Sequence, residues 1–183
     1  MENRERHSQR VFTKRENQAQ RVSTEHRENQ AQRVFLAPTP HFAERVRASF
    51  GRQRAMALIR ATLIDVQPGY CAIALTPHED VTQQHGYVHA GIVAAIVDSA
   101  GGYAGYTLFP EGTSVLTVEY KLNLLAPAQG ERIIAEGFVV KPGRTLAITR
   151  GDVHAERDGK RTLVAIMQQT LMVMHGKRDD AGA

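Results

Sequence analysis

A helix-length stretch of small apolar residues, with a single carboxylate among them, occurs in this chain. It begins in HGYVHAGIVAAIVDSA, residues 85–100, and continues through the adjacent pair Gly101 and Gly102. A helix that is apolar all round is usually buried all round. Adjacent glycines cost about 1 kcal/mol each in a helix interior, so their presence indicates close approach by another backbone. The stretch therefore predicts a central helix over roughly Gly91–Phe109, with other elements wrapped closely around it.

The carboxylate in this helix belongs to Asp98, about two turns inside, beside Ile96 and Val97. Burying a carboxylate costs several kcal/mol unless it is paired, hydrogen-bonded or used in catalysis. The alternative is that Asp98 faces solvent on the helix surface. The start of a helix also offers unpaired backbone N–H groups that suit a developing negative oxygen. The helix therefore predicts a base and an anion site on one element.

The remaining apolar patterns predict one short helix and six strands. The helix spans His41–Gln53, with Phe42, Val46 and Phe50 at helical spacing. Hairpin signals at Pro68-Gly69 and Asp158-Gly159 separate neighbouring strands. The expected strands are Ala61–Gln67, Tyr70–Pro77, Val115–Leu125, Arg132–Val140, Thr145–Arg157 and Arg161–Met174. One long helix among six antiparallel strands fits an α+β fold in which the sheet wraps around the helix.

A repetitive segment precedes this pattern. The octapeptide RENQAQRV occurs at Arg15–Val22 and again at Arg27–Val34. The segment is polar, charged and poor in branched apolar residues, a composition typical of disorder, and it lacks the apolar core of a signal peptide. We expect a disordered arm over residues 1–36, one folded domain over 37–176 and a disordered tail over 177–183.

Charge and cysteine content exclude several classes of protein. The net charge is +4, but the first 36 residues hold eight Lys or Arg against five Glu, so the rest carries only +1. Trp is absent and no basic face is evident, so no nucleic-acid partner is expected. No run of about eighteen apolar residues occurs, so no membrane span is expected. The single cysteine, Cys71, suggests a reducing compartment such as the cytoplasm.

Three motifs occur in the order found in a known family. Gln83, Gly86, His89-Ala90-Gly91 and Asp98 match its pattern of an amide residue, glycine, His-Gly-Gly and acid, with Ala90 replacing the middle glycine. Thr117–Tyr120 through Leu125–Ala128 is similar to its strand ending in a Pro-Ala turn, and Lys141–Leu146 is similar to its next hairpin. Over Phe42–Met174 the chain resembles the hotdog-fold acyl-CoA thioesterases of the phenylacetate-pathway (PaaI-like) type.

This resemblance implies hydrolysis of acyl-CoA thioesters to free acid and coenzyme A. Asp98 would activate water or attack directly, and Thr117 would hydrogen-bond the water or the carboxylate. Backbone N–H groups of Ala90 and Gly91 would hold the oxyanion, and Gln83 would orient the water or the thioester carbonyl. No cofactor is implied, because coenzyme A is part of the substrate. If the site needed positive φ at Ala90, its methyl group would add strain.

The resemblance also implies that each site lies between two subunits, in a homodimer or in a homotetramer of paired dimers. Gln83 and the His89 turn would come from one subunit, and Asp98 and Thr117 from the other. His89 could instead be a general base, although its position before the helix suits a histidine that fixes the turn. His85 and His89 are four residues apart, as metal ligands on a helix would be, but Gly86 between them weighs against a metal site.

Two other function classes remain open at this point. An acyl-thioester hydratase or dehydratase would need His89 to face substrate together with a carboxylate. A non-hydrolytic acyl-CoA-binding protein would need no base at all. The acyl group is also open, with Tyr103, Tyr106 and Leu116 as candidate pocket residues. Glu119 is interpreted as a strand residue, and Arg144, Lys121 and Arg150 as solvated charges or as contacts for the coenzyme's phosphates.

Overall fold

The structure is a computed structural model, and it describes residues 34–177. The expected disordered arm, apart from its last three residues, and the expected tail, apart from Lys177, lie outside this range. The described part begins with two helices, α2 (Phe42–Arg52) and α3 (Arg54–Leu58), and holds one long helix, α4 (Ala90–Tyr106). Its strands are β1 (Thr62–Gln67), β2 (Tyr70–Leu75), β3 (Thr113–Leu124), β4 (Arg132–Lys141), β5 (Leu146–Arg157) and β6 (Lys160–His175), and a single 3-10 turn, η1 (Glu79–Val81), follows β2.

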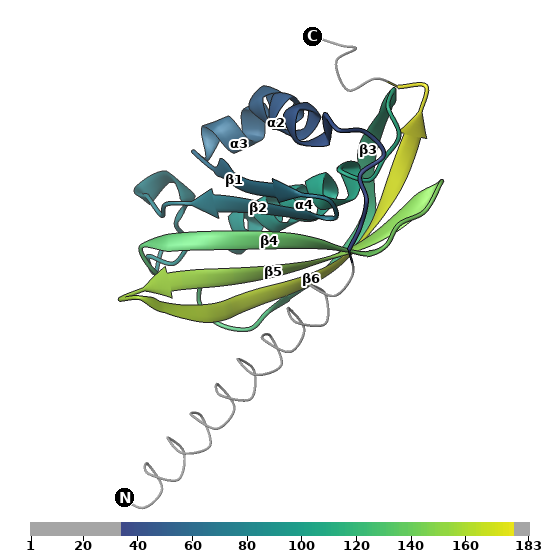
Figure 1. The fold of residues 1–183 in the computed structure, drawn as a ribbon. Coiled ribbons are helices and arrows are strands. Elements are labelled where there is room, and N and C mark those ends of the chain that lie inside the picture. The colour runs from purple at the N-terminus through teal and green to yellow at the C-terminus, as the bar shows by residue number, and fades with distance from the viewer. Residues whose placement is uncertain (1–33, 178–183) are drawn as a thin grey trace, which may run out of the picture. The chain divides into compact units, whose positions relative to one another are not determined.

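The six strands form one antiparallel sheet in the order β1-β2-β4-β5-β6-β3. The long helix α4 connects β2, near one edge, to β3 at the opposite edge, and so it crosses the inner face of the sheet. Figure 1 shows the sheet curving around α4, with α2 and α3 above the helix. This is the hotdog fold, and it confirms the expected α+β class.

The hairpin signals act where the sequence places them. Gly69 has φ +78° in the turn between β1 and β2. Asp158 and Gly159, between β5 and β6, have φ +50° and +70°, which are the values that a two-residue type I′ turn requires. All six expected strands and both expected helices are confirmed, with shifts of a few residues at their ends. The short helix α3 was not predicted.

The sheet approaches α4 closely at two glycines of its central strands. A side chain at Gly137 on β4 would collide with the backbone of Ala100 and Gly101, and one at Gly151 on β5 would collide with Val97. The central strands therefore touch α4 directly. At Gly101 a side chain would instead meet Gln169 and Thr149, which are side chains and not backbone. The expected close approach by another backbone does occur at Gly101, which the backbone of β4 approaches at Gly137.

The helix α2 is tied to the end of α4 by one arginine. The guanidinium of Arg45 donates to the carbonyl oxygens of Tyr106, Phe109 and Pro110 at 2.8, 2.7 and 2.9 Å. A cation is stabilised there because the last carbonyls of a helix carry partial negative charge. Tyr106 lies under this guanidinium, which is 4.3 Å from its ring centre, and is 1% exposed. It therefore belongs to the core, and α2 is held over α4.

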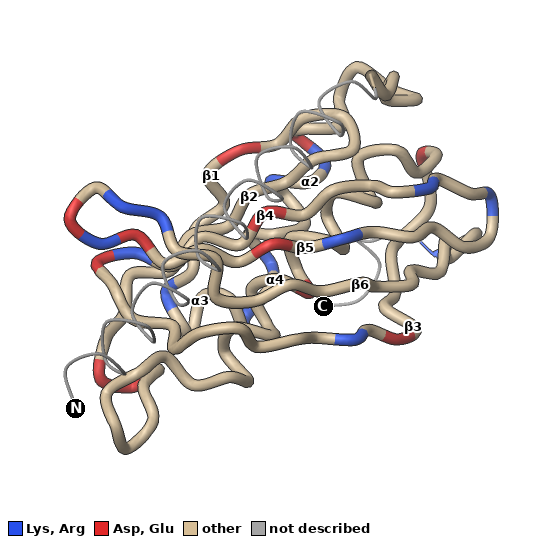
Figure 2. The backbone as a smooth tube through the Cα atoms, turned by 90° about the horizontal axis from the view of Figure 1, so that it is seen from below, with Lys and Arg blue, Asp and Glu red and all other residues tan. Residues whose placement is uncertain are grey.

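One edge strand of the sheet, β3, carries few charged residues. Figure 2 shows β3 mostly in tan, and the charged residues of this strand are Glu119 and Lys121. Leu116, Val118 and Tyr120 on the same strand are about half exposed. Within residues 34–177, no helix is long and apolar enough to cross a membrane.

Candidate active site

The acid predicted to be catalytic lies in a hydrogen-bonded cluster near the middle of α4. Thr117 on β3 donates its hydroxyl to Asp98 Oδ1 at 2.9 Å. Gln169 on β6 donates its side-chain amide to the same oxygen and also lies 3.2 Å from the main-chain oxygen of Asp98. No hydrogen bond from residues 34–177 reaches Asp98 Oδ2. One carboxylate oxygen is therefore fixed by two strands, and the other is available for chemistry.

Gln169 is itself held in one orientation. Its side-chain oxygen accepts a hydrogen bond from Thr149 on β5 at 2.8 Å, which leaves its NH₂ group to donate toward Asp98 and Thr117. Gln169 is 1% exposed and Thr149 is fully buried. Gly101 provides the space, because a side chain there would overlap the oxygen of Gln169. Hydrogen bonds therefore join Thr149, Gln169, Asp98 and Thr117 into one continuous polar network.

Burial and hydrogen bonding shift the pKa of Asp98 in opposite directions. Burial raises the pKa of Asp98 above its ordinary value, and the hydrogen bonds from Thr117 and Gln169 lower it in part. Asp98 is half-buried and lines a cavity, so it neither points freely into water nor lies in a wholly apolar interior. A carboxylate with a raised pKa is a better proton acceptor at neutral pH. This is the behaviour required of a general base.

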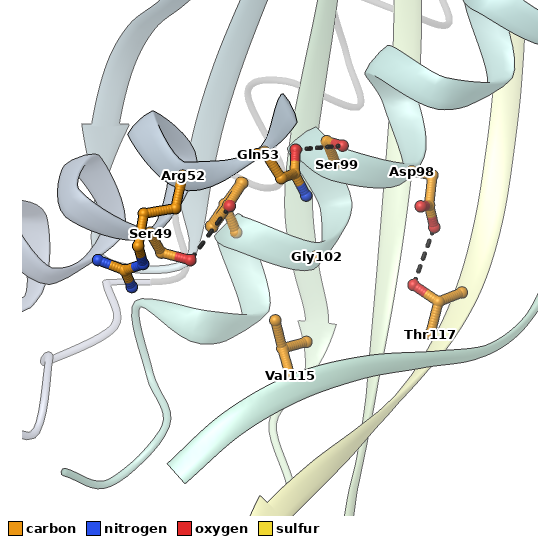
Figure 3. A pocket seen from close by; sticks show the side chains of 9 residues that line it. Ser49, Arg52, Gln53, Asp98, Ser99, Gly102, Val115 and Thr117 are labelled. Atoms are coloured by element: carbon orange, nitrogen blue, oxygen red, sulfur yellow. Dashed lines mark hydrogen bonds between the residues drawn. The ribbon is translucent and has the colours of Figure 1, made fainter. Parts of the chain in front are cut away.

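A cavity of about 250 Å³ opens beside Asp98, between α2, α4 and the start of β3. Figure 3 shows that Ser49, Arg52 and Gln53 reach it from the α2 side, while Asp98 and Thr117 close its other end. Its remaining lining residues are Ser99, Gly102, Tyr103 and Val115. Of the three pocket residues named from sequence, Tyr103 lines this cavity, Tyr106 belongs to the core and Leu116 is exposed.

A second polar cluster lies at the start of α4. His89 is the N-cap residue, with φ −60° and ψ 137°, and its Nδ1 accepts the N–H of Gly91 at 2.9 Å. Gln83 accepts the N–H of His85 through its side-chain oxygen at 2.6 Å. Ala90 is helical and has no positive φ, so its methyl group adds no backbone strain. Within the described residues, the Ala90 N–H has no acceptor, whereas the Gly91 N–H already has one.

The two clusters are separated within one chain. Asp98 follows Ala90 by eight residues, which corresponds to about 12 Å along a helix axis. A single thioester carbon cannot contact both Asp98 and the first turn of the same helix. The chain thus brings Asp98 together with Thr117, and separately gathers Gln83, His89, Ala90 and Gly91.

The other candidate residues lie outside both clusters. His85 is exposed, and residues 34–177 contain no group of three metal-ligating side chains. Cys71 is fully buried in β2, and burial raises the pKa of its thiol, so it is no nucleophile. Glu119 accepts a hydrogen bond from Thr170 on the outer face of the sheet. Arg150 pairs with Asp152 at 2.9 Å.

Known proteins with a similar sequence or fold include several thioesterases. Residues 85–162 match the model of the Thioesterase superfamily. A thioesterase family protein from Silicibacter pomeroyi is 45% identical, with a TM-score of 0.73, over 74% of this chain and 99% of that one. The chain belongs to the thioesterase superfamily.

Two more distant proteins are also similar to this chain, one in sequence and one in fold. Human acyl-coenzyme A thioesterase 13 is 29% identical over 102 residues, which is 55% of this chain and 72% of that protein. The PaaI protein of the E. coli phenylacetic acid degradation operon has a TM-score of 0.67 at 14% identity, over 75% of this chain and 96% of that one, which shows the shared fold. The chain is accordingly a thioester hydrolase.

Proposed function

We propose that this thioesterase hydrolyses acyl-CoA to a free acid and coenzyme A, with Asp98 as the base that activates water or as the nucleophile. The observation that carries the proposal is the arrangement at Asp98. Thr117 and Gln169 hold Oδ1, while Oδ2 stays without a partner among the described residues at the wall of a cavity. A positioned base of this kind typically contributes about 10²–10⁴-fold.

In this proposal the oxyanion is held by the partner subunit. The tetrahedral intermediate needs N–H donors about 3 Å from its oxygen, and those at the start of α4 are too far from Asp98 of the same chain. The partner's Ala90 N–H would donate to the oxyanion, with the Gly91 N–H joining if the His89 ring turns away. The partner's Gln83 would orient the water or the thioester carbonyl.

The edge of the sheet supports a homodimer, alone or paired into a homotetramer. β3 is a twelve-residue edge strand whose exposed face carries Leu116, Val118 and Tyr120. Unpaired edges of this length and hydrophobicity are normally covered, because their free N–H and C=O groups pair with other strands. Two-fold pairing of β3 with its copy would direct the two α4 helices oppositely and bring one helix start toward the other subunit's Asp98.

The proposal needs no metal or cofactor, and it places the enzyme in the reducing cytoplasm, where its single thiol would stay free. His89 would serve as a helix cap and not as the proton-transfer histidine of a hydratase. That assignment is supported by its Nδ1, which accepts the Gly91 N–H.

Product analysis tests the activity directly. The full chain is incubated with acyl-CoA thioesters, and coenzyme A thiol and free acid are measured together. Release of both products in equal amounts is expected. A hydratase would change the acyl group without releasing thiol, and a binding protein would return the acyl-CoA intact, so either of these results would contradict the proposal.

A further inference from the structure

The cavity beside Asp98 has an unusual lining for a site that receives an acyl chain. Binding pockets for small molecules are mostly apolar, with a few polar groups that fix orientation. Here Val115 is the alkyl side chain of the lining, and the rest of the wall beyond Asp98 and Thr117 carries hydroxyl, amide, phenol and guanidinium groups or is glycine. The cavity therefore offers little apolar surface to an alkyl chain.

Two long hydrogen bonds join polar side chains of this wall. The hydroxyls of Ser49 and Tyr103 are 3.2 Å apart, and Ser99 donates to the side-chain oxygen of Gln53 at 3.3 Å. Hydroxyl hydrogen bonds are normally about 2.7–2.8 Å long, so both contacts are weak. The side-chain NH₂ group of Gln53 has no hydrogen-bond partner among residues 34–177. Ser49, Ser99 and Gln53 can therefore bind a polar ligand without losing a short side-chain hydrogen bond to the described residues.

Gly102 provides the room for that ligand. A Cβ added at Gly102 would meet nothing within 4 Å, although the residue itself is buried. At the neighbouring Gly101, by contrast, an added Cβ would collide with the side chain of Gln169. The open space is therefore on the Gly102 side of α4, next to the carboxylate.

We propose that this cavity is the acyl subsite and that it selects acyl groups bearing a hydroxyl or carbonyl oxygen over alkyl chains of the same length. The inference rests on the proposed function, because Asp98 marks the position of the thioester carbon. An alkyl group would displace water from Ser49, Ser99 and Gln53 without replacing its hydrogen bonds. Sites built to hydrogen-bond a substrate discriminate strongly against analogues that lack the polar group.

Matched substrate pairs test this selectivity on the full chain. We would measure kcat/KM by thiol release for butanoyl-CoA against 3-hydroxybutanoyl-CoA and 3-oxobutanoyl-CoA, and for the same three forms with six- and eight-carbon chains. At least one polar form is expected to exceed its alkyl counterpart by about tenfold or more at each length it fits. Equal or higher values for the alkyl forms at every length would overturn the inference while leaving the hydrolase proposal intact. Failure of every thioester to react would contradict the hydrolase proposal itself.

Two variants test whether the polar residues that line the cavity cause this selectivity. Ser49→Ala and Gln53→Leu are expected to reduce the ratio of polar to alkyl kcat/KM by about fivefold or more, with the larger share in KM for the polar form. Gln168→Leu, an exposed glutamine on β6, is the matched control for Gln53→Leu and should leave the ratio unchanged. If both wall variants keep the wild-type ratio while remaining folded by circular dichroism, the cavity does not select the acyl group.

A third variant tests the space itself. Gly102→Val places a branched side chain in the open part of the cavity. It is expected to lower kcat/KM for the eight-carbon substrates by at least tenfold more than for acetyl-CoA. Equal losses for short and long acyl groups would show that the acyl group lies elsewhere.

Discussion

The middle of α4 and its first turn both carry polar groups, but the two regions are built differently. At the middle, the side chains of Thr117, Gln169 and Asp98 come from three elements and fix one another within a single chain. At the first turn, the Ala90 N–H has no acceptor among the described residues, the Gly91 N–H is bonded to His89, and Gln83 lies in the preceding loop. The first region holds its acid in place with side chains of its own chain. The second region offers a hydrogen-bond donor, but Asp98 of its own chain is out of its reach. This difference is the basis of our proposal that the site is shared between two copies of the chain.

The largest expected effect comes from removing the charge of the first region. Asp98→Asn should lower kcat by about 10²–10⁴-fold, because the base or nucleophile is lost. The fold should persist, since the asparagine oxygen can still accept from Thr117 and Gln169. Steady-state thiol release measures the loss, and an unchanged kcat would remove Asp98 from the mechanism.

The direction in which Asp98→Asn changes the stability of the fold follows from the pKa of Asp98. Because burial raises the pKa of Asp98, the unfolded chain ionises this group more readily than the folded one. Wild-type stability therefore decreases as pH rises from the unfolded pKa to the folded pKa, and the loss persists above it. At neutral pH the variant should have a Tm equal to or above that of the wild type. A lower Tm would show that the carboxylate stabilises the fold.

The second region is tested by removing one N–H group. Proline is accepted at the first residue of a helix, and His89 already has the extended conformation that a residue before proline needs. Ala90→Pro should therefore leave the Tm nearly unchanged while lowering kcat by about 10²–10³-fold, through loss of one oxyanion donor. A kcat within twofold of wild type would exclude the Ala90 N–H as a donor.

Mixing the two variants tests whether the regions meet across an interface. In a dimer with one Asp98→Asn chain and one Ala90→Pro chain, one of the two shared sites has both groups intact. Random reassembly of equal amounts should restore about a quarter of wild-type activity, because half of the dimers are mixed and each has one working site. If every site lay within one chain, mixing would restore nothing.

A smaller effect is expected from the support beneath Asp98. Gln169→Leu removes a donor that stabilises the carboxylate, so the pKa of Asp98 should rise and the acid limb of the kcat/KM profile should move to higher pH. A hydrogen bond to a charged group contributes about 1.5–3 kcal/mol, so kcat/KM should fall by about tenfold or more on the acid limb and by less above it. The exposed Gln168→Leu should match the wild type, and a purely structural role for Gln169 would lower activity equally at all pH values.

The adjacent glycines Gly101 and Gly102 provide a second test of the role of Gln169 beneath Asp98. Gly101→Ala should displace Gln169 and shift the acid limb in the same direction, because its methyl group would overlap the Gln169 oxygen. Gly102→Ala meets nothing within 4 Å and should leave the pH of the acid limb in place, whatever it does to substrate binding. Identical profiles for the two variants would show that Gln169 does not set the pKa of Asp98.

The sequence predicts the helices, strands and turns better than it predicts the residues that hold Asp98 in place. Hairpin turns such as Asp158-Gly159 depend on local φ values, and the helix over 91–109 depends on local composition, so both are readable from the chain. The pairing of Asp98 with Thr117 came from a family resemblance. Gln169 was missed because Gln168 precedes it, and strand alternation shows that one of the two faces inward without showing which one. The register shift in the β5–β6 pairing, between Val153 and His154, adds to that ambiguity. The cavity was missed because it depends on how Arg45 holds α2 over α4, a contact between residues more than sixty positions apart.

The smallest effect is expected from the repetitive N-terminal segment. Both regions of the site are formed by residues after 82, and the described chain is in contact with the core from Phe35 onward. Deleting residues 1–33 should therefore leave kcat, KM and the oligomeric state unchanged, as measured by thiol release and sedimentation. Deleting residues 1–36 also removes the half-buried ring of Phe35, which lies against Gly69, and should cost about 1 kcal/mol of stability without changing the acid limb. A loss of activity in the shorter deletion would mean that the segment contributes to one of the two regions, and the mixing experiment would then show which of them.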